Sequence, residues 1–508
     1  MPKILLNMKK NFKIFYSLLL MSSMMIGMYG CQKLLDRKPL TATLEDLNQG
    51  GLEGQIYGLY SNLRNSAGFT TIPWLAVHDF RSEDSEKGSD PSDGAEWVAP
   101  FDNFAYVKDL WATNQYWDDH YSLINLANTA IQTADSLKLA DASSMINIAE
   151  AKFLRAYSYF DLVRTYGDVP KIDFRVYNAN QANIAKSPAS AIYALIDADL
   201  TFASTYLPIA WGNQYPGRLT SGAAKTLLAK AHLFRGNWSQ ALALSNSVMS
   251  GGSYSLYNSY YGIFKDAGEN CSESIFEIQA YVSPNGAVNN GMGFATCMGV
   301  RASSASGWNL GWGWDTPTDN LVGAYEAGDV RKQSTILFSG QSDDPATGGY
   351  GRVLPGYVTD PGGFLPRKYW NKKIYADPAY RTSTGMSDNP AWINKRVLRY
   401  SDVVLMAAEC MNETGNGAGA VGLVNSIRSR AGLANIAFVS QAQMRTTIKK
   451  ERRVEFALEG ERFFDLVRWG DAVSVLGPLG YSNKCRFYPL PQPAIDKSGG
   501  KLIQNPEW

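Results

Sequence analysis

Apolar residues recur at helical spacing in the clearest stretch of the chain, AEAKFLRAYSYFDLVRTYGDVP (residues 149–170). Phe153, Tyr157 and Phe160 fall three or four positions apart, which places their side chains on one face of a helix. Gly167 follows the last apolar position and is a common helix terminator. The pattern therefore predicts one long amphipathic helix that ends at this glycine.

Two further stretches each predict a pair of helices. Residues 220–249 are amphipathic on both sides of Gly236, and residues 398–433 repeat the design around a turn at 415–417. Both resemble tetratricopeptide helix pairs, in which small residues let the two helices pack closely. The matching positions are Ala229, Gly236, Trp238 and Ala241 in the first stretch, and Ala408, Gly415, Ala420 and Val424 in the second. We expect degenerate helix pairs stacked into a right-handed superhelix.

The centre of the chain has a different pattern. Residues 285–313 and 339–363 are rich in Gly, Ser, Pro and Asn and predict long loops with short strands. Residues 80–100 are polar and acidic and also predict a loop. No stretch has the composition of an interdomain linker, so we predict a single, mainly α-helical domain over residues 31–508. Its expected helical scaffold covers mainly 40–70, 115–250 and 395–470, and its loop-rich, ligand-binding part with short strands covers mainly 71–114 and 251–394.

The first 30 residues predict an export signal. Three lysines between residues 9 and 13 precede the apolar stretch Ile14–Tyr29, which ends in Gly30-Cys31. Sixteen residues are short for a bilayer span, which needs about 20. A small residue before Cys resembles the bacterial lipobox, so we expect Cys31 to be acylated and to anchor the chain to a membrane. The alternative is a simple membrane anchor. Translation could begin at Met1 or Met8.

Charge and cysteine content exclude several classes of protein. The chain has 48 basic and 47 acidic side chains without a block of like charge, which gives no basic patch for nucleic acid. Cys271, Cys297, Cys410 and Cys485 are widely spaced and form no CxxC pair. Neither a disulfide framework nor a zinc site is therefore indicated. We expect most of these thiols to be small core residues.

Five segments, in this order along the chain, carry a family resemblance: AEAKFLRAYSYFDLVRTYGDVP (149–170), GRLTSGAAKTLLAKAHLFRGNW (217–238), VNSIRSRAGL (424–433), ERRVEFALEGERFFDLVRWG (451–470) and YPLPQPAID with LIQNPEW (488–508). Together they resemble the SusD/RagB family of outer-membrane nutrient-binding lipoproteins. The resemblance implies a tetratricopeptide-like superhelix whose variable half holds the ligand. It also implies an outer-membrane, lipid-anchored protein on the cell exterior that delivers oligosaccharides, or in some members peptides, to a SusC-like TonB-dependent transporter.

Catalytic motifs are missing from the sequence. The three histidines form no HExxH, and no GxSxG, Walker loop or GxGxxG after a strand occurs. We therefore predict a binding protein without enzymatic activity. A surface glycosidase, which needs only two suitably spaced carboxylates, stays open as an alternative from another class, and so does a peptide-binding member of the family. An intracellular tetratricopeptide adaptor would require the export signal to be spurious.

Two clusters of charged residues are interpreted as structural. Arginine forks match carboxylates well, so we expect one cluster to lock the C-terminal helices together. Its members are Arg428, Arg430, Glu451, Arg452, Arg453, Glu455, Glu459, Arg462, Asp465 and Arg468. The second cluster is Asp79, Glu83, Asp84 and Glu86. We expect these acids to be solvated or to cap helices, and we predict no cofactor; a calcium ion stays open there although the spacing fails the EF-hand template.

Aromatic residues in the loops are the candidate ligand-binding residues. Sugar rings present apolar C–H faces that stack on Trp or Tyr, and their hydroxyls need polar partners at the rim. Loop positions between the first helices and in the central half supply this mixture. The predicted ligand-binding residues are Trp74, Trp97, Asn103, Tyr106 and Trp308. Trp117, Tyr121, Trp238, Trp312, Trp314 and Trp469 match stretches common to the family and are interpreted as scaffold.

Overall fold

The computed structural model describes residues 50–508 except 91, 95, 303–305, 345–348, 358–366, 376 and 386–389. The predicted export signal and Cys31 lie outside these described residues. The fold is mainly helical, as the sequence predicts, and its strands are few and short.

The first half of the fold consists almost entirely of helices. Its elements are α2 (Gly51–Asn65), α3 (Ala67–Thr70), α4 (Ile72–His78), β1 (Ser85–Gly88), α5 (Ala99–Asp102), α6 (Trp111–Ser136), α7 (Ala142–Tyr166), α8 (Ala179–Ala182), α9 (Ala189–Tyr206), α10 (Ser221–Phe234) and α11 (Trp238–Ser250). The turn predicted at Gly236 separates α10 from α11, and Gly236 has a φ of 71° there.

Helix α7 shows how local sequence sets the boundaries of a long helix. The Asp141 side chain accepts hydrogen bonds from the backbone N–H groups of Ser143 and Ser144 and caps the first turn. Gly167 follows the last residue with a φ of 78°, a conformation that glycine adopts without strain. Phe153 and Tyr157 are buried between these ends. The helix predicted from the apolar spacing is confirmed.

The C-terminal part returns to helices after the central segment. Its elements are α16 (Tyr400–Glu413), α17 (Gly417–Arg430), α18 (Gln441–Glu455), α19 (Arg462–Trp469), α20 (Ala472–Leu476) and α21 (Gln492–Lys497), with the short 3₁₀ helices η7 (Gly477–Leu479) and η8 (Asn483–Arg486). Helix α16 ends before the predicted turn, where Gly415 has a φ of 87°. Both predicted helix pairs are therefore present.

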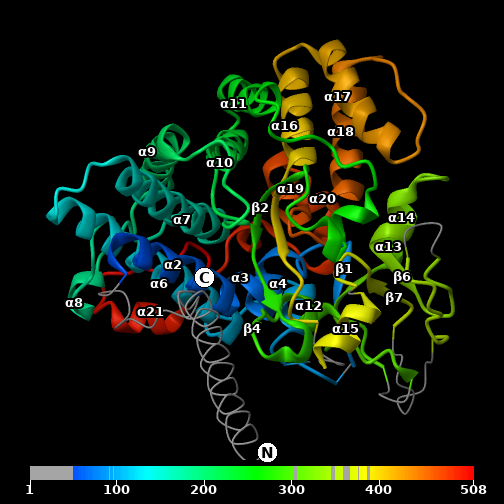
Figure 1. The fold of residues 1–508 in the computed structure, drawn as a ribbon, viewed down its shortest axis with the longest axis horizontal. Helices are drawn as coiled ribbons and strands as arrows, with labels where there is room; N and C mark the ends of the chain where they lie inside the picture. The colour runs from blue at the N-terminus through cyan, green and yellow to red at the C-terminus, as the bar shows by residue number, and fades with distance from the viewer. Residues whose placement is uncertain are drawn as a thin grey trace, which may run out of the picture.

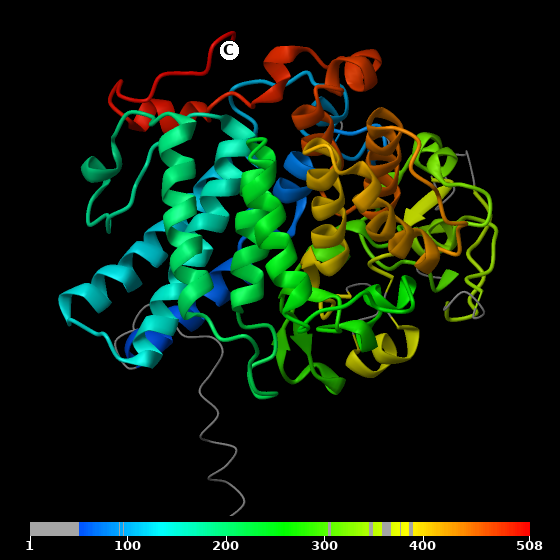
Figure 2. The same ribbon diagram turned by 90° about the horizontal axis from the view of Figure 1, so that it is seen from above.

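Successive helices stack side by side into one array. Helix α7 packs against α6 and α9, α9 against α10, α10 against α11, and α11 against α16, which pairs with α17 and α18. Seen from above, the array runs from the teal helices through green to gold and orange (Figure 2). In the view down the short axis it covers the left and the top of the molecule, and the strand-bearing part lies at the lower right (Figure 1).

The central segment contains short strands, as the sequence predicts. Its strands and helices are β2 (Ser274–Ile278), β3 (Tyr281–Val282), β4 (Asn289–Asn290), α12 (Phe294–Met298), β5 (Trp314–Pro317), α13 (Asp319–Ala324), α14 (Val330–Thr335), β6 (Ile336–Phe338), β7 (Tyr369–Asn371), α15 (Pro378–Thr384) and β8 (Lys395–Arg399). The 3₁₀ helices are η2 (Tyr261–Phe264), η3 (Asp266–Gly268) and η4 (Pro284–Gly286). Within the described parts of the chain, four antiparallel pairs form: β1–β5, β2–β8, β3–β4 and β6–β7.

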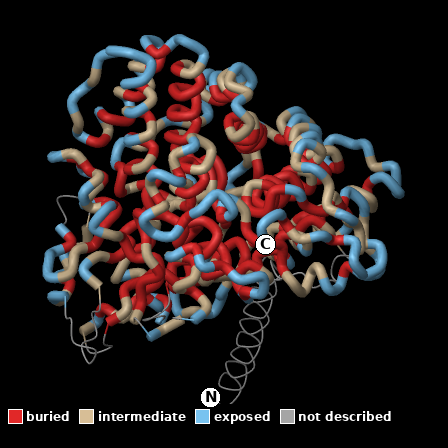
Figure 3. The backbone as a smooth tube through the Cα atoms, turned by 180° about the vertical axis from the view of Figure 1, so that it is seen from behind, coloured by how far each residue is buried: buried red, intermediate tan, exposed pale blue. Residues whose placement is uncertain are grey.

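Buried residues form a continuous band through the array and the base of the strand-bearing part, and exposed residues lie at the rim (Figure 3). One hydrophobic cluster extends from Leu52 in the first described helix to Leu502 near the C-terminus. Smaller clusters lie beneath the loops of the central segment, one of them around Trp308 and Trp370. Elements from both halves of the sequence therefore share one core.

The charged residues of the C-terminal helices are structural, as predicted. Arg452 is fully buried and donates to Asp402 of α16 and to Asp465 of α19. Arg331 is also fully buried and contacts Glu451 and Glu455 of α18. We call the whole set the arginine–carboxylate network; its other pairs include Arg399–Glu273, Arg399–Glu459, Arg428–Glu451, Arg430–Glu455, Lys230–Asp402 and Arg468–Glu409.

The expectation that the four acids between residues 79 and 86 are solvated or cap helices is wrong for Asp79, Glu83 and Asp84, which are buried, whereas the Glu86 side chain is 44% exposed. The predicted loop over residues 80–100 also contains the short strand β1, which pairs with β5. Glu83 accepts from Arg462, and Asp84 accepts from Arg453. These acids are buried because basic side chains from α18 and α19 neutralise them, so they extend the arginine–carboxylate network into the first hundred residues.

Candidate functional site

An open pocket with an aromatic wall lies where the segment after β1 meets the segment before β5. Its volume is about 530 Å³, within the range of roughly 300–1,000 Å³ that is usual for small-molecule sites. We call it the aromatic pocket. It is lined by Ile72, Asp93, Trp97, Arg301, Asn309, Gly311, Trp312 and Trp314.

Two glycines hold the Trp312 backbone against its neighbours. A Cβ atom at Gly311 would lie 2.4 Å from the carbonyl oxygen of Thr296, and Gly313 has a φ of 77°. The Trp312 N–H donates to the same Thr296 oxygen at 2.8 Å. Because the backbone is fixed on this inner side, the indole projects outward and is 49% exposed. Trp312 thus offers an open aromatic face on a fixed backbone at the pocket.

Two further tryptophans support that wall. Trp97 is half-buried, with ring centroids 5.6 Å from Trp314 and 5.2 Å from Trp111. The Trp97–Trp111 contact is edge-to-face, a favourable arrangement for aromatic rings. Trp314 is buried and packs beneath Gly94, where a Cβ atom would approach the indole to 2.6 Å. The wall is therefore preformed, with Trp312 and Trp97 at its surface and Trp314 behind them.

Charged and amide groups form the rim of the pocket. Arg301 donates to the side chains of Asp93 and Ser89, and Ser89 donates to Asp93 at 2.9 Å. The Arg301 and Asp93 side chains are 41% and 37% exposed, so both retain surface for a ligand. Asn309 adds an amide on the same rim. These groups supply charged and neutral hydrogen-bonding partners next to the aromatic wall.

Lys87 fixes the loop that carries Asp93. Its ammonium group donates to the carbonyl oxygens of Gly88, Asp90 and Asp93 at 3.3, 2.9 and 2.6 Å. Burial lowers the Lys87 pKa below its usual value. At the base of the loop, both carboxylate oxygens of Asp102 accept hydrogen bonds from the backbone N–H of Lys87. The rim is thus held in place before any ligand arrives, which reduces the cost of ordering it on binding.

The five predicted ligand-binding residues are not brought together. Trp97 lines the aromatic pocket. Trp74 is only 4% exposed; it stacks on His78 at 4.6 Å, and the Lys395 ammonium lies 3.3 Å from its ring centre. A buried indole flanked on its faces in this way has no surface for a sugar ring, so Trp74 belongs to the core.

The other three predicted residues also lie outside the pocket. Tyr106 is buried against Tyr488, with ring centroids 4.4 Å apart. Trp308 is buried in the smaller core cluster, where it stacks on Tyr375 and its indole N–H donates to the Val353 carbonyl oxygen at 2.8 Å. Asn103 is exposed, but it caps a local turn and does not line the pocket.

Sequence reasoning missed several residues of the pocket. Trp312 was expected to be scaffold, but it is the most exposed aromatic residue of the wall. The paired glycines on either side of it were the available signal, because they mark close backbone approach and leave the side chain between them outside. Arg301 and Asp93 come from segments 208 positions apart, and no local pattern pairs them.

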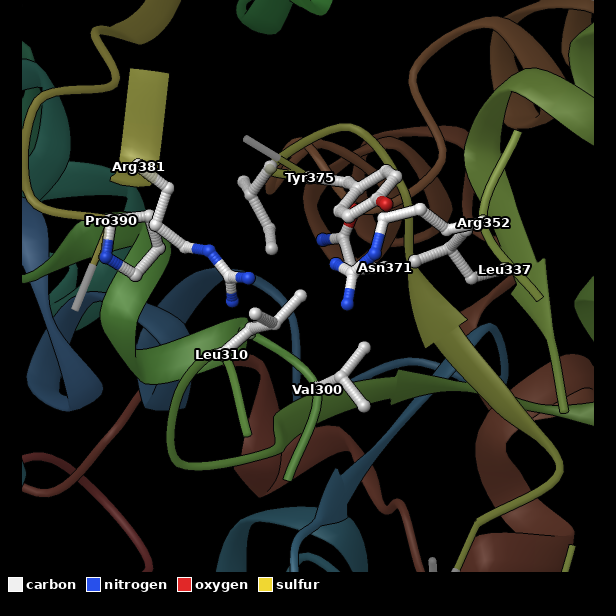
Figure 4. Close-up of a pocket in the computed structure, with 10 residues that line it drawn as sticks. Val300, Leu310, Leu337, Arg352, Asn371, Tyr375, Arg381 and Pro390 are labelled. Carbon is white, nitrogen blue, oxygen red and sulfur yellow. The ribbon is translucent and has the colours of Figure 1, made fainter. Parts of the chain in front are cut away.

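A second cavity of the central segment is too small for a sugar. It has a volume of about 10 Å³ and lies between apolar side chains and two arginines. Figure 4 shows Arg352 and Arg381 reaching toward the gap from opposite sides above Val300 and Leu310. Since a single water needs roughly 10–15 Å³, this cavity holds at most one water.

Among the described residues, no three His, Cys, Asp or Glu side chains converge as a metal site. The four cysteines after Cys31 are free in the structure. None of the helices in the described part of the chain combines the length and hydropathy of a bilayer span. Among the described residues that line the aromatic pocket, Asp93 alone is a carboxylate.

Two family models match the chain. The SusD family matches residues 272–485, and a family described as starch-binding associating with outer membrane matches residues 84–233. Among relatives, SusD-like protein P2 of Formosa agariphila is 28% identical over 443 residues, which cover 80% of this chain and 83% of that protein.

Solved structures have the same fold. A laminarin-binding SusD-like protein is 27% identical with a TM-score of 0.74, over 90% of this chain and 99% of that chain. Surface glycan-binding protein A of Bacteroides thetaiotaomicron in complex with laminarihexaose is 24% identical with a TM-score of 0.74, over 89% of this chain and 98% of that chain. The helical architecture is therefore shared along almost the whole described chain.

Proposed function

Because the chain belongs to the SusD/RagB family, we propose that it captures a glycan in the aromatic pocket and passes it to a SusC-like TonB-dependent transporter. The observation that supports this proposal best is the open face of Trp312 beside Trp97, with Arg301, Asp93 and Asn309 around it. Sugar rings need this combination of an apolar stacking surface and a polar rim.

The residues that line the aromatic pocket fit capture of a glycan without catalysis. Hydrolysis of a glycosidic bond requires two carboxylates on opposite sides of the bond, one of them protonated. The aromatic pocket has only Asp93 among its described lining residues, and Arg301 neutralises it. An open site buries less of its ligand than an enclosed one and so gives more modest affinity, which suits a protein that must release what it binds.

The proposed location follows from the family and the predicted signal. Acylation of Cys31 would tether the protein to the outer membrane, facing the cell exterior. Laminarin is the first glycan to test, because a structural relative is named for binding it. A partner transporter would receive the glycan from the pocket.

Affinity electrophoresis of the purified full chain in detergent tests the binding. Laminarin, amylopectin, xylan and galactomannan serve as neutral polysaccharides, and a parallel assay measures new reducing ends. We expect retardation by at least one glycan, no new reducing ends, and clearly weaker retardation of Trp312→Ala than of wild type. Tyr177→Ala, which removes an aromatic ring that is 62% exposed elsewhere, is the matched control and should behave as wild type.

Each contrary result has a definite meaning. New reducing ends would make the protein a glycosidase. Retardation of Trp312→Ala equal to that of wild type would mean that the glycan does not bind in the aromatic pocket. A failure of every glycan to retard the chain would reject glycan capture and leave peptides as the ligand class to test.

A further inference from the structure

A second open pocket of similar size lies away from the aromatic pocket. Its volume is about 520 Å³. The connection between α9 and α10 forms one wall, and residues 253–254, 269–270 and 274–277 form the other. We call it the α9–β2 pocket. It shares no lining residue with the aromatic pocket, so the two can be occupied independently.

One wall of the α9–β2 pocket is a rigid aromatic surface. The Trp211 indole N–H donates to the Leu219 carbonyl oxygen at 2.7 Å, which fixes the ring. The Tyr215 ring meets Trp211 edge-to-face at 5.7 Å, and the Arg218 guanidinium lies 4.0 Å from the Trp211 ring centre. Arg218 is itself held by Glu150 at 2.5 Å. Trp211 and Tyr215 are both half-buried, so each keeps part of its ring open to the pocket.

Neutral hydrogen-bonding groups from both walls line the rest of the pocket. The side chains of Asn270 and Gln279 exchange two hydrogen bonds, at 2.9 and 3.0 Å, behind the exposed edge of Asn270. The Thr220 and Tyr254 hydroxyls lie 2.6 Å apart on the α10 side. The exposed amide of Asn213 stands on the rim. Amides and hydroxyls of this kind match the hydroxyl groups of a sugar.

Formal charges in the α9–β2 pocket are compensated. Arg218 is neutralised by Glu150 and Glu53. Glu269 and Glu277 lie 3.6 and 3.5 Å from Arg396. Burial also raises the Glu269 pKa to about 8, which favours its uncharged form at neutral pH. Among the described residues that line this pocket, the one cation is Arg218, which is already paired, so an anionic ligand would find no partner for its charge, whereas a neutral ligand needs none.

We propose that the α9–β2 pocket is a second saccharide-binding site, which holds a neutral segment of the glycan captured in the aromatic pocket. This inference rests on the proposed function, since it takes the same class of ligand. Two sites on one chain raise the affinity for a long polysaccharide above that for a short oligosaccharide, because binding at one site concentrates the polymer near the other.

Isothermal titration of the purified full chain in detergent tests the proposal. The probes are the hexasaccharides of the four neutral polysaccharides used above, and polygalacturonate is the anionic control. We expect about two hexasaccharides per chain for wild type and about one for Trp312→Ala or for Trp211→Ala. The polysaccharide affinity of Trp211→Ala should fall by roughly tenfold or more, as expected when one of two linked sites is lost.

A second variant guards against local unfolding around Trp211. Ser253→Trp replaces a small, exposed side chain that lines the pocket with a bulky ring. It should also reduce the stoichiometry to about one. Its matched control is Ser136→Trp, which adds the same ring at an exposed position at the end of α6 and should keep about two.

The outcomes separate the two proposals. A wild-type stoichiometry of about one that Trp312→Ala abolishes, with Ser253→Trp unchanged, would overturn the second site and leave the proposed function standing. Equal binding of polygalacturonate at the α9–β2 pocket would overturn the neutral-ligand assignment. No binding of any probe by wild type would reject both.

Discussion

Arg452 and Arg301 each pair with carboxylates, but they do so in opposite surroundings. Arg452 is fully buried between Asp402 and Asp465, and three helices meet at its guanidinium. Arg301 stands at the rim of the aromatic pocket, where it and Asp93 are each exposed by about two fifths. A buried charge depends on its partners, whereas an exposed pair contributes little to stability and remains available to a ligand. Burial, more than residue type, thus separates scaffold from site.

The strongest test of this contrast is Arg452→Ala. Removing the Arg452 side chain leaves two buried carboxylates without their partner and should destabilise the fold by about 3–5 kcal/mol. We expect a low soluble yield or a large fall in Tm, measured by thermal denaturation, with unchanged glycan affinity in the folded fraction.

Arg445→Ala is the matched control on the same helix. Arg445 is 40% exposed and pairs with Glu413 on the surface, so its loss should cost less than about 1 kcal/mol. Normal folding of Arg452→Ala with lost glycan binding would contradict the structural role of the network.

Trp312→Ala should have the next largest effect, and on affinity alone. The exposed ring contributes little to the core, so Tm should stay within about 1–2 °C of wild type. Glycan affinity should fall at least about tenfold, or ~1.4 kcal/mol, by isothermal titration. A fall in Tm as large as that of Arg452→Ala would show that Trp312 is scaffold, as the sequence alone had suggested.

Arg301→Ala sharpens the comparison at a smaller scale. Removing one exposed charged donor should weaken glycan binding by about 3- to 10-fold and change stability by less than about 1 kcal/mol. Arg301→Lys, which keeps the charge but loses the planar fork, should recover only part of the affinity. Thermal denaturation and titration of the same samples separate the two effects. Equal losses of stability in Arg301→Ala and Arg452→Ala would erase the distinction between rim and core.

The smallest expected effect is a dependence of stability on pH. Folding raises the Glu269 pKa from an ordinary value of 4.5 to about 8, because burial disfavours the charged form. The folded protein therefore holds this proton more tightly than the unfolded chain, and the stability that it contributes is lost as pH rises through 8. Compared with Glu269→Gln, wild type should lose about 1–2 °C more in Tm between pH 6 and 9. Glu507→Gln, at an exposed position, should not alter this difference.

The helices were predictable from sequence because their signals are local. The spacing of Phe153 and Tyr157 and the position of Gly167 define α7 without any knowledge of its neighbours. The site was less predictable, because an aromatic residue in a loop carries no mark of its exposure. Trp308 and Trp312 are four positions apart, yet one stacks under Tyr375 and the other faces solvent. Only the packing of distant segments decides between these outcomes.

The prediction that the acids after α4 are solvated was wrong for the same reason. Its residues are polar, which is typical of a solvated loop, and the cations that bury them come from α18 and α19. A window of a few residues around Glu83 cannot contain that information.

The length of chain between these partners has a consequence for how the protein is made. Glu83 and Arg462 are 379 positions apart, and the Asp79 carboxylate accepts from the Gly460 N–H across 381 positions. Contacts that join such distant residues form slowly, because a long loop must close before any of them is gained. During synthesis, the early acids therefore lack their counter-charges until nearly the whole chain has emerged. A chain truncated before residue 450 would leave Glu83 and Asp84 without the arginines that neutralise them.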